Sequence, residues 1–158
     1  MNSKKLKILY HLLVNIQRSV GTFPVESGGI LLGSRKYGII TEYYFDFMGS
    51  RSGNGYDPHV DFLNHIVKKE WSENKRELVG FVHSHPRGAY WLSGDWGNGT
   101  GDMAYIERIF QAMPALKRFY VPIVYSTVDG GPFEIFPYIA ERDNVENYQL
   151  AQLEIIKN

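Results

Sequence analysis

Two histidines with metal-site spacing, His83 and His85, stand at the end of an apolar stretch. Residues 77–82 are apolar enough to form a buried strand, which Pro86 and Gly88 would end. Because side chains alternate between the two faces of a strand, both imidazoles would leave the strand on the same side. A pair of imidazoles at a rigid strand end is a good start for a transition-metal site.

A catalytic zinc site commonly takes three protein ligands and leaves a fourth position for water. The loop downstream of the histidines contains two carboxylates that could supply the third ligand, Asp95 and Asp102. Each also has an ordinary structural role available. Asp102 could cap a helix, and Asp95 could stabilise a turn through its own backbone. We expect one of the two to be a ligand.

Hydrolysis at such a site also requires a carboxylate that takes a proton from the attacking water and passes it to the leaving amine. Glu26 directly precedes a glycine-rich segment, 28–33, and is a candidate for this base. A hydrogen-bond donor for the developing oxyanion is needed as well, and Ser93 is the nearest hydroxyl in the same loop as the two aspartates.

Taken together, these residues resemble the JAMM motif of the MPN (JAB) metalloproteases. In that family a glutamate before a glycine-rich strand is followed by His-x-His, seven residues, a serine, two residues and an aspartate. This chain has Glu26, His83, His85 and Ser93 in that order, with seven residues between the second histidine and the serine. The resemblance covers the order of elements over most of the chain.

The chain departs from the family pattern at the aspartate. Trp96 stands three residues beyond Ser93, while Asp95 comes one residue too early and Asp102 six residues too late. In the family the ligating aspartate lies at the start of the following helix, and Asp102 leads directly into a helical pattern. We therefore expect an insertion within 94–101 and favour Asp102 as the third ligand, with Asp95 as the alternative.

The resemblance implies a function and a role for each residue. His83, His85 and one aspartate would hold a single zinc ion, Glu26 would be the general base and then the acid, and Ser93 would help to bind the oxyanion. Catalytic members cut peptide or isopeptide bonds after the C-terminal tail of ubiquitin or a ubiquitin-like protein. The chain looks like the stand-alone prokaryotic members, whose partners are such modifiers, their conjugates and other components of the conjugation pathway.

Two alternatives remain open at this stage. One is a non-catalytic MPN scaffold that binds partner proteins, which the displaced aspartate would favour. The other is a hydrolase that uses the same site to release an amino acid from the C-terminus of a carrier protein.

The sequence predicts a single α+β domain over residues 1–158, with a curved, mainly antiparallel sheet flanked by helices. Apolar residues repeat every three or four positions in the expected helices, which are 6–20, 60–71, 102–113 and, more weakly, 145–156. The expected strands are 25–33, 38–48, the strand that carries the histidines, and a hairpin of 119–126 with 132–139. Residues 49–59 and 87–101 are expected to be loops. The aromatic residues Tyr90, Trp91 and Trp96 would either face a substrate or pin the second loop to the domain.

Composition narrows the remaining possibilities. Lys plus Arg and Asp plus Glu both number 17, so no overall charge would attract nucleic acid or an anionic membrane. The small basic clusters, Lys4, Lys5 and Lys7 and the pair Lys68 and Lys69, are interpreted as solvated helix faces. The absence of cysteine excludes thiol catalysis and Cys-ligated zinc. No secretion signal or membrane span is recognisable, and a cytoplasmic protein is expected.

Overall fold

The computed structural model describes residues 4–52, 55–94, 101–128 and 130–157. The helices are α1 (Tyr10–Arg18), α2 (Val60–Asn74) and α3 (Asp102–Ala112). The strands are β1 (Lys5–Leu9), β2 (Gly28–Ser34), β3 (Ile39–Phe45), β4 (Ser50–Ser52), β5 (Gly55–Asp57), β6 (Glu77–His85), β7 (Arg118–Tyr120), β8 (Ile123–Tyr125), β9 (Glu134–Phe136), β10 (Tyr138–Glu141), β11 (Asn144–Leu150) and β12 (Gln152–Ile156).

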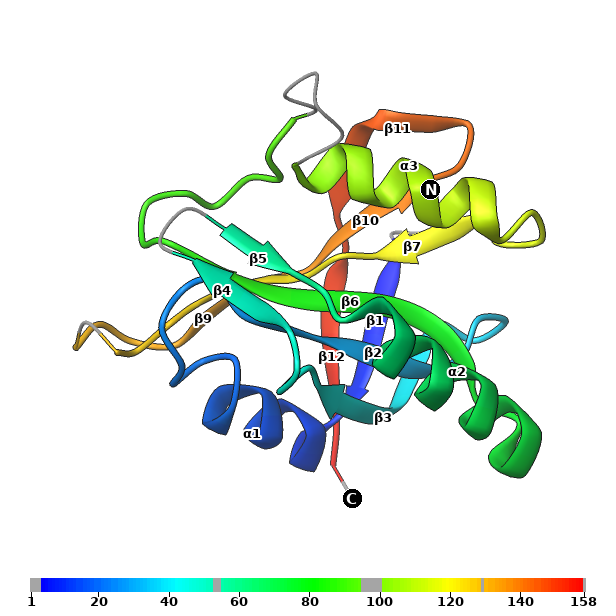
Figure 1. Ribbon diagram of the computed structural model, residues 1–158, viewed down its shortest axis with the longest axis horizontal. Helices are drawn as coiled ribbons and strands as arrows, with labels where there is room; N and C mark the ends of the chain where they lie inside the picture. Colours follow the sequence, from blue (N-terminus) through cyan, green and yellow to red (C-terminus); the bar gives the residue numbers. More distant parts are fainter. Residues whose placement is uncertain (1–3, 53–54, 95–100, 129, 158) are drawn as a thin grey trace.

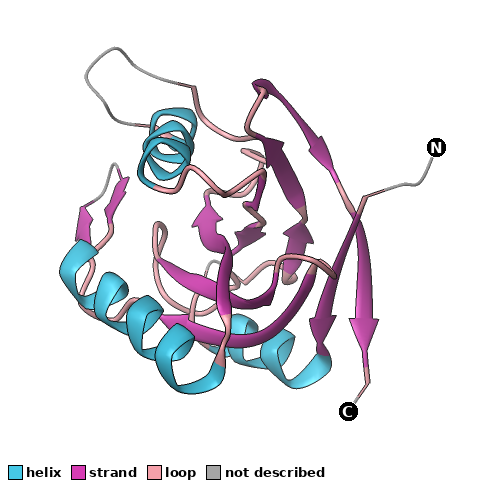
Figure 2. Ribbon diagram, turned by 90° about the vertical axis from the view of Figure 1, so that its right-hand side faces the viewer, coloured by secondary structure: helices cyan, strands magenta, loops and turns pink. Residues whose placement is uncertain are grey.

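The protein has an α+β architecture built on one curled, mixed sheet. Its strand order is β11-β10-β7-β6-β2-β3-β1-β12, and β8 and β9 extend from the second half of β6. Among the described strands of this sheet, antiparallel pairs slightly outnumber parallel ones. Helix α3 lies near one end of the curl, while α1 and α2 lie near the other (Figures 1 and 2).

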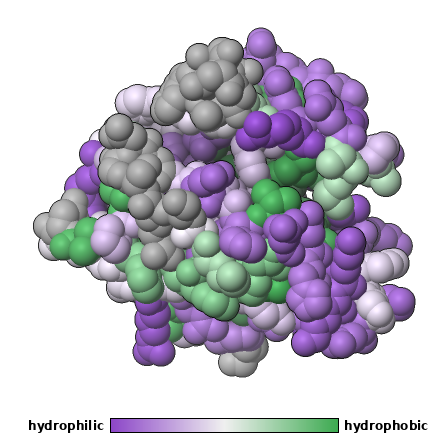
Figure 3. Space-filling model, in the orientation of Figure 1, coloured by the Kyte–Doolittle hydropathy of each residue, from purple (hydrophilic) through white to green (hydrophobic). Residues whose placement is uncertain are grey.

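Both faces of the central strands are buried. Ile30 and Leu32 of β2 pack in the cluster that includes residues of α2 and α3, and Leu31 packs in the cluster on the α1 side. Such two-sided burial explains why residues 28–33 of β2 are apolar and do not alternate with polar residues. The surface in Figure 3 is mostly hydrophilic, with small hydrophobic areas between the polar side chains.

The prediction of a C-terminal helix over 145–156 is wrong. This segment forms β11 and β12, separated by Ala151 alone. Strand β11 pairs antiparallel with β10, and β12 pairs parallel with β1, so one stretch of chain lies at both ends of the strand order. The weak helical pattern is overridden because the backbone at both sheet ends gains hydrogen-bond partners from this segment.

The predicted first helix, 6–20, is also wrong over its first turn. Residues 5–9 form β1, where Leu6 and Ile8 are buried and alternate with lysines, and the helix begins only at Tyr10. A further correction concerns the predicted loop 49–59, which contains the short hairpin of β4 and β5.

The other described elements agree with the sequence-based expectations, except that β2 begins at Gly28 where a strand from residue 25 was expected, and β3 ends at Phe45 where a strand to residue 48 was expected. Helices α2 and α3 begin at the predicted residues. The predicted hairpin is confirmed, since β8 pairs antiparallel with β9 and β7 pairs antiparallel with β10 in one continuous register. In the described part of the chain, no helix combines the length and apolar character needed to cross a bilayer.

A buried carboxylate links α2 to the sheet. Glu70 is 4% exposed and accepts hydrogen bonds from Tyr44 Oη at 2.7 Å, Arg76 Nη1 at 2.8 Å and Asn74 Nδ2 at 3.3 Å. Burial by itself raises the pKa of Glu70, but these donors outweigh it, so the pKa lies below its ordinary value. The bond to Glu70 is also the main reason why the pKa of Tyr44 rises to about 12.

Replacing this carboxylate by an amide should destabilise the protein in a pH-dependent way. Glu70→Gln should lower the free energy of unfolding at pH 7 by about 1–3 kcal/mol, because hydrogen bonds to a charged acceptor are lost. The depressed pKa contributes stability that is present above pH ~4.5 and is lost as the pH falls through the folded-state pKa. Urea unfolding at pH 7 and pH 4 measures this difference.

The control is Glu73→Gln, which removes an exposed carboxylate from the same helix. An equal loss of stability in the two variants, or a loss that does not shrink at low pH, would contradict the assigned role of Glu70.

Candidate metal centre

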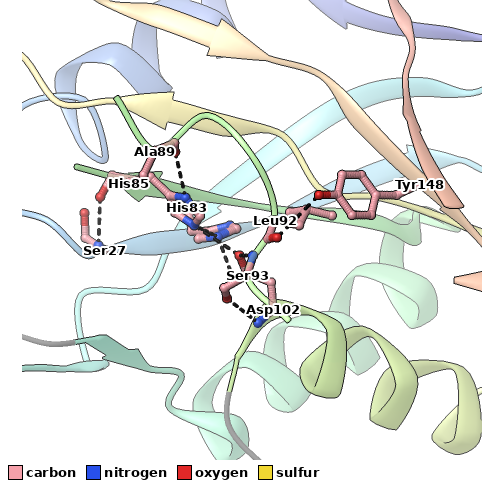
Figure 4. A network of polar contacts seen from close by, with 9 residues as sticks. Ser27, His83, His85, Ala89, Leu92, Ser93, Asp102 and Tyr148 are labelled. Atoms are coloured by element: carbon pink, nitrogen blue, oxygen red, sulfur yellow. Dashed lines mark hydrogen bonds and ion pairs between the residues drawn. The ribbon is translucent and has the colours of Figure 1, made fainter. Parts of the chain in front are cut away.

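Three side chains from two elements meet at the C-terminal end of β6. His83 and His85 lie at the end of β6, and Asp102 is the first residue of α3 (Figure 4). Both histidines are buried, with 4% and 5% exposure, and the Asp102 side chain is 16% exposed. As expected from the alternation along a strand, the two imidazoles leave β6 on the same side.

The potential ligand atoms of these side chains converge closely. His83 Nε2 and His85 Nε2 are 2.9 Å apart, and the Asp102 carboxylate oxygens lie 3.0 Å and 3.1 Å from them, respectively. Two ligands about 2.0–2.1 Å from a tetrahedral ion are about 3.3 Å apart, so small movements would accommodate a metal. His83, His85 and Asp102 therefore form a group that could hold a metal ion.

The His85 ring is oriented for ligation by its second nitrogen. His85 Nδ1 lies 3.0 Å from the carbonyl oxygen of Ala89. A hydrogen on Nδ1 would be donated to that carbonyl and would leave the Nε2 lone pair facing His83 and Asp102, as in typical metal-binding histidines. His83 Nδ1 is buried without a hydrogen-bond partner among the residues that the structure describes.

Ser93 fixes the start of α3. Its backbone N–H donates to Asp102 Oδ2, and its Oγ accepts from the Asp102 N–H, both at 2.8 Å. The N–H of Met103 donates to the Ser93 carbonyl at 3.0 Å. Gly101 has φ +104°, and a Cβ there would lie 1.9 Å from the oxygen of Gly94. The chain thus leaves Ser93 and returns to it at Asp102, which is why the unusual Ser-to-Asp spacing is compatible with a compact site.

Glu26 lies just before β2, near the histidine end of β6. Gly28 pairs with His83 across β2 and β6, and the N–H of Ser84 donates to the Ser27 carbonyl at 2.9 Å. Glu26 therefore directly precedes the residue whose backbone is hydrogen-bonded to Ser84, between the two histidines. Ser84 Oγ accepts from the Ser27 N–H at 3.0 Å, which ties this segment to β6.

The charges of the group are strongly coupled. Burial raises the pKa of Glu26 above its ordinary value, with the Asp102 charge adding to the rise and His83 and His85 opposing it. Burial would raise the pKa of Asp102 as well, but the two histidines outweigh it and hold that pKa well below the usual range. Glu26 thus lies within electrostatic reach of all three potential ligands, as a separate carboxylate whose proton affinity is increased.

Two tyrosines from the C-terminal half support the loop between the histidines and Asp102. Tyr138 Oη donates to the Tyr90 carbonyl at 2.5 Å. Tyr148 Oη donates to the Leu92 carbonyl at 3.4 Å (Figure 4). Sequence reasoning did not find these tyrosines, since they lie 48 and 56 residues beyond their acceptors. The contact of Tyr148 with Leu92 was also not expected because residues 145–156 were predicted to form a helix.

Not every predicted residue falls within the structure's description. Asp95 and Trp96 lie outside the described residues, so their positions relative to the histidines are not assigned. Tyr90 and Trp91 are about half exposed, at 52% and 51%, and their rings pack edge to face. The loop is thus pinned through its backbone while it presents aromatic surface.

Comparison with known proteins identifies a shared fold. No protein-family model matches the sequence, and no curated protein matches it significantly. The solution structure of protein DSY2949 from Desulfitobacterium hafniense is similar, with a TM-score of 0.63 and 11% sequence identity over 97% of this chain and 94% of that chain. Identity this low speaks for a common fold alone.

If the third ligand is Asp102, changing it should remove the metal. Asp102→Asn should weaken binding of a divalent transition ion about 100-fold or more, since loss of a ligand costs more than the 10–100-fold typical of outer-shell partners. Elemental analysis and metal titration of the purified proteins measure this. Asp95→Asn is the matched control and should bind normally. Loss of metal in Asp95→Asn with retention in Asp102→Asn would overturn the choice of Asp102.

Proposed function

We propose that this protein is a zinc-dependent peptidase or isopeptidase of the JAMM type, with an MPN (JAB) domain that acts in the cytoplasm. One observation carries the proposal. Glu26 interacts electrostatically with His83, His85 and Asp102, and its neighbour Ser27 is hydrogen-bonded to Ser84 between the two histidines, although Glu26 lies 57 residues before the first histidine. A structural histidine pair would not need a carboxylate of raised pKa that is separate from the potential ligands.

The donor set supports zinc as the ion. Two imidazoles and one carboxylate are a common catalytic zinc set, and they leave a coordination position open. When bound, zinc supplies Lewis-acid chemistry and makes a water molecule acidic enough to be a nucleophile near neutral pH. His83, His85 and Asp102 would hold the ion, and the hydrogen bonds from Ser93 to Asp102 would keep the carboxylate in place.

Glu26 moves the proton in this proposal. Its carboxylate accepts a proton from the attacking water, and the same group then donates that proton to the amine that leaves. Its raised pKa suits both steps, because a carboxylate of ordinary pKa would bind the proton too weakly. Ser93 Oγ uses a lone pair for the Asp102 N–H, and in this proposal its own hydrogen is donated to the developing oxyanion.

The proposed substrate is the C-terminal tail of a ubiquitin-like protein, joined by a peptide or isopeptide bond. An extended tail can add to a free sheet edge by backbone hydrogen bonds. Among the described strands, β9 pairs with β8 alone, and β8 lies beside the histidine end of β6. The rings of Phe136 on β9 and Tyr90 are 6.0 Å apart, so this edge adjoins the loop that leads to Asp102.

No observation in the described residues favours a non-catalytic scaffold. The argument for a scaffold was that the aspartate does not stand at the position of the family pattern, yet Asp102 lies beside both histidines. Release of an amino acid from a carrier protein would use the same groups and differs only beyond the scissile bond.

A glutamine at position 26 separates catalysis from metal binding. Glu26→Gln should reduce cleavage of a ubiquitin-like fusion by about 10²–10⁴-fold, the range typical of a general acid–base group. Zinc content should remain unchanged, because Glu26 is not a ligand. Single-turnover cleavage and elemental analysis measure the two effects. Glu107→Gln, an exposed change on α3, is the control and should be fully active.

Wild-type protein with bound zinc that cleaves no member of a panel of ubiquitin-like fusions would contradict the proposal. Full activity of Glu26→Gln would do so as well.

A further inference from the structure

A second candidate site lies at the opposite end of β6. An open cleft of about 520 Å³ is formed between the start of β1, the turn that joins β2 to β3, and β7. Its lining residues are Lys4, Lys5, Lys7, Arg35, Lys36, Tyr37, Gly38, Arg118 and Tyr120. In Figure 1, β6 runs from right to left, away from the turn that joins β2 to β3.

Positive charge is concentrated in this cleft although the chain as a whole is neutral. Six of the 17 Lys and Arg residues line it. Three carboxylates pair with them: Glu141 with Lys4 and Arg118, Glu154 with Lys5, and Glu77 with Arg35. Six cations against three anions leave a surplus of three positive charges.

Two lysines account for part of this surplus of positive charge, one on β1 and one in the turn between β2 and β3. Lys7 and Lys36 have no ion pair with an acidic group in the described part of the chain. Lys36 Nζ lies 5.3 Å from the ring centroid of Tyr37, whose side chain is 63% exposed. An aromatic face therefore stands next to an uncompensated cation at the rim of the cleft.

The cleft has an ordered framework. Tyr120 is 2% exposed, and its Oη donates to the Lys5 carbonyl at 2.9 Å, which joins β7 to β1. Arg35 Nε donates to the Leu78 carbonyl at 2.9 Å, so the guanidinium is held before any ligand arrives. Lys4, Lys5 and Lys7 were interpreted from sequence as a solvated helix face, but they precede or belong to β1. The converging strands bring them together with Arg35 and Arg118.

We propose that this cleft binds a small molecule with a diphosphate or longer polyphosphate group, either a nucleotide or inorganic polyphosphate. A diphosphate group carries about three negative charges near neutral pH, which matches the surplus. Arginine forks and lysine point charges are the usual partners of phosphate oxygens. The volume falls within the roughly 300–1,000 Å³ typical of ligand sites. In a nucleotide, the base would stack on Tyr37.

The site is independent of the proposed metal chemistry. Eight residue steps of about 3.3 Å separate Glu77 from His85 along β6, a span of roughly 26 Å. Binding at the cleft can therefore be tested in protein that carries no metal. This also avoids a confounding effect, because pyrophosphate itself chelates divalent ions.

The test is calorimetric titration of chelator-treated full-length protein at low ionic strength with ADP, inorganic pyrophosphate and adenosine. ADP and pyrophosphate should bind, and adenosine should not. The double variant Lys7→Ala/Lys36→Ala should weaken both affinities by about tenfold or more, because two charge-assisted contacts are lost. The matched double variant Lys68→Ala/Lys69→Ala removes the same charge from the exposed face of α2 and should bind like wild type.

Tyr37→Ala distinguishes the two sources of the phosphate group. A larger loss for ADP than for pyrophosphate supports a nucleotide, and an equal affinity of wild type and Tyr37→Ala for both probes supports inorganic polyphosphate. Thermal unfolding of each variant checks that the fold is retained. Absence of binding by wild type to either phosphate probe would overturn the proposal. Equal weakening in the two lysine variants would overturn it too, since it would show a general charge effect.

Discussion

The register between β2 and β6 is the constraint on which the candidate metal centre depends. A shift of one residue between antiparallel strands turns every side chain to the opposite face. Here the observed pairing of Gly28 with His83 brings the segment that precedes β2, including Glu26, to the histidine end of β6. Contacts at both edges of β6 stabilise this pairing. Ser27 and Ser84 are joined by two hydrogen bonds at one edge, and β8 pairs with the other edge. Buried faces on both sides make any other register costly.

The C-terminal strands extend this constraint to the loop beside the site. β11 and β12 occupy the two ends of the strand order, so the curled sheet is stabilised by one short stretch of chain. Tyr148 of β11 and Tyr138 of β10 hold backbone carbonyls of the loop that leads to Ser93. The same strands that complete the sheet thereby restrict the segment from which Asp102 approaches the histidines.

The two ends of β6 differ in their electrostatics. At the histidine end, a partly buried aspartate of lowered pKa and a glutamate of raised pKa lie near two imidazoles. At the other end, lysines and arginines outnumber the carboxylates that pair with them. Overall neutrality conceals this separation, because composition counts charges without their positions. The two ends of one strand therefore carry chemically distinct groups of side chains.

Short-range sequence patterns predicted the local features, which are the histidine-bearing strand, the starts of α2 and α3, and the hairpin of the 119–139 region. These depend on periodicity and on residues that begin or end an element, which short segments encode. Tertiary structure decided that 145–156 forms strands, that Lys4, Lys5 and Lys7 join a cleft, and that Asp102 meets both histidines. The reason is that pairing partners far along the chain supply the backbone hydrogen bonds and burial that outweigh weak local preferences.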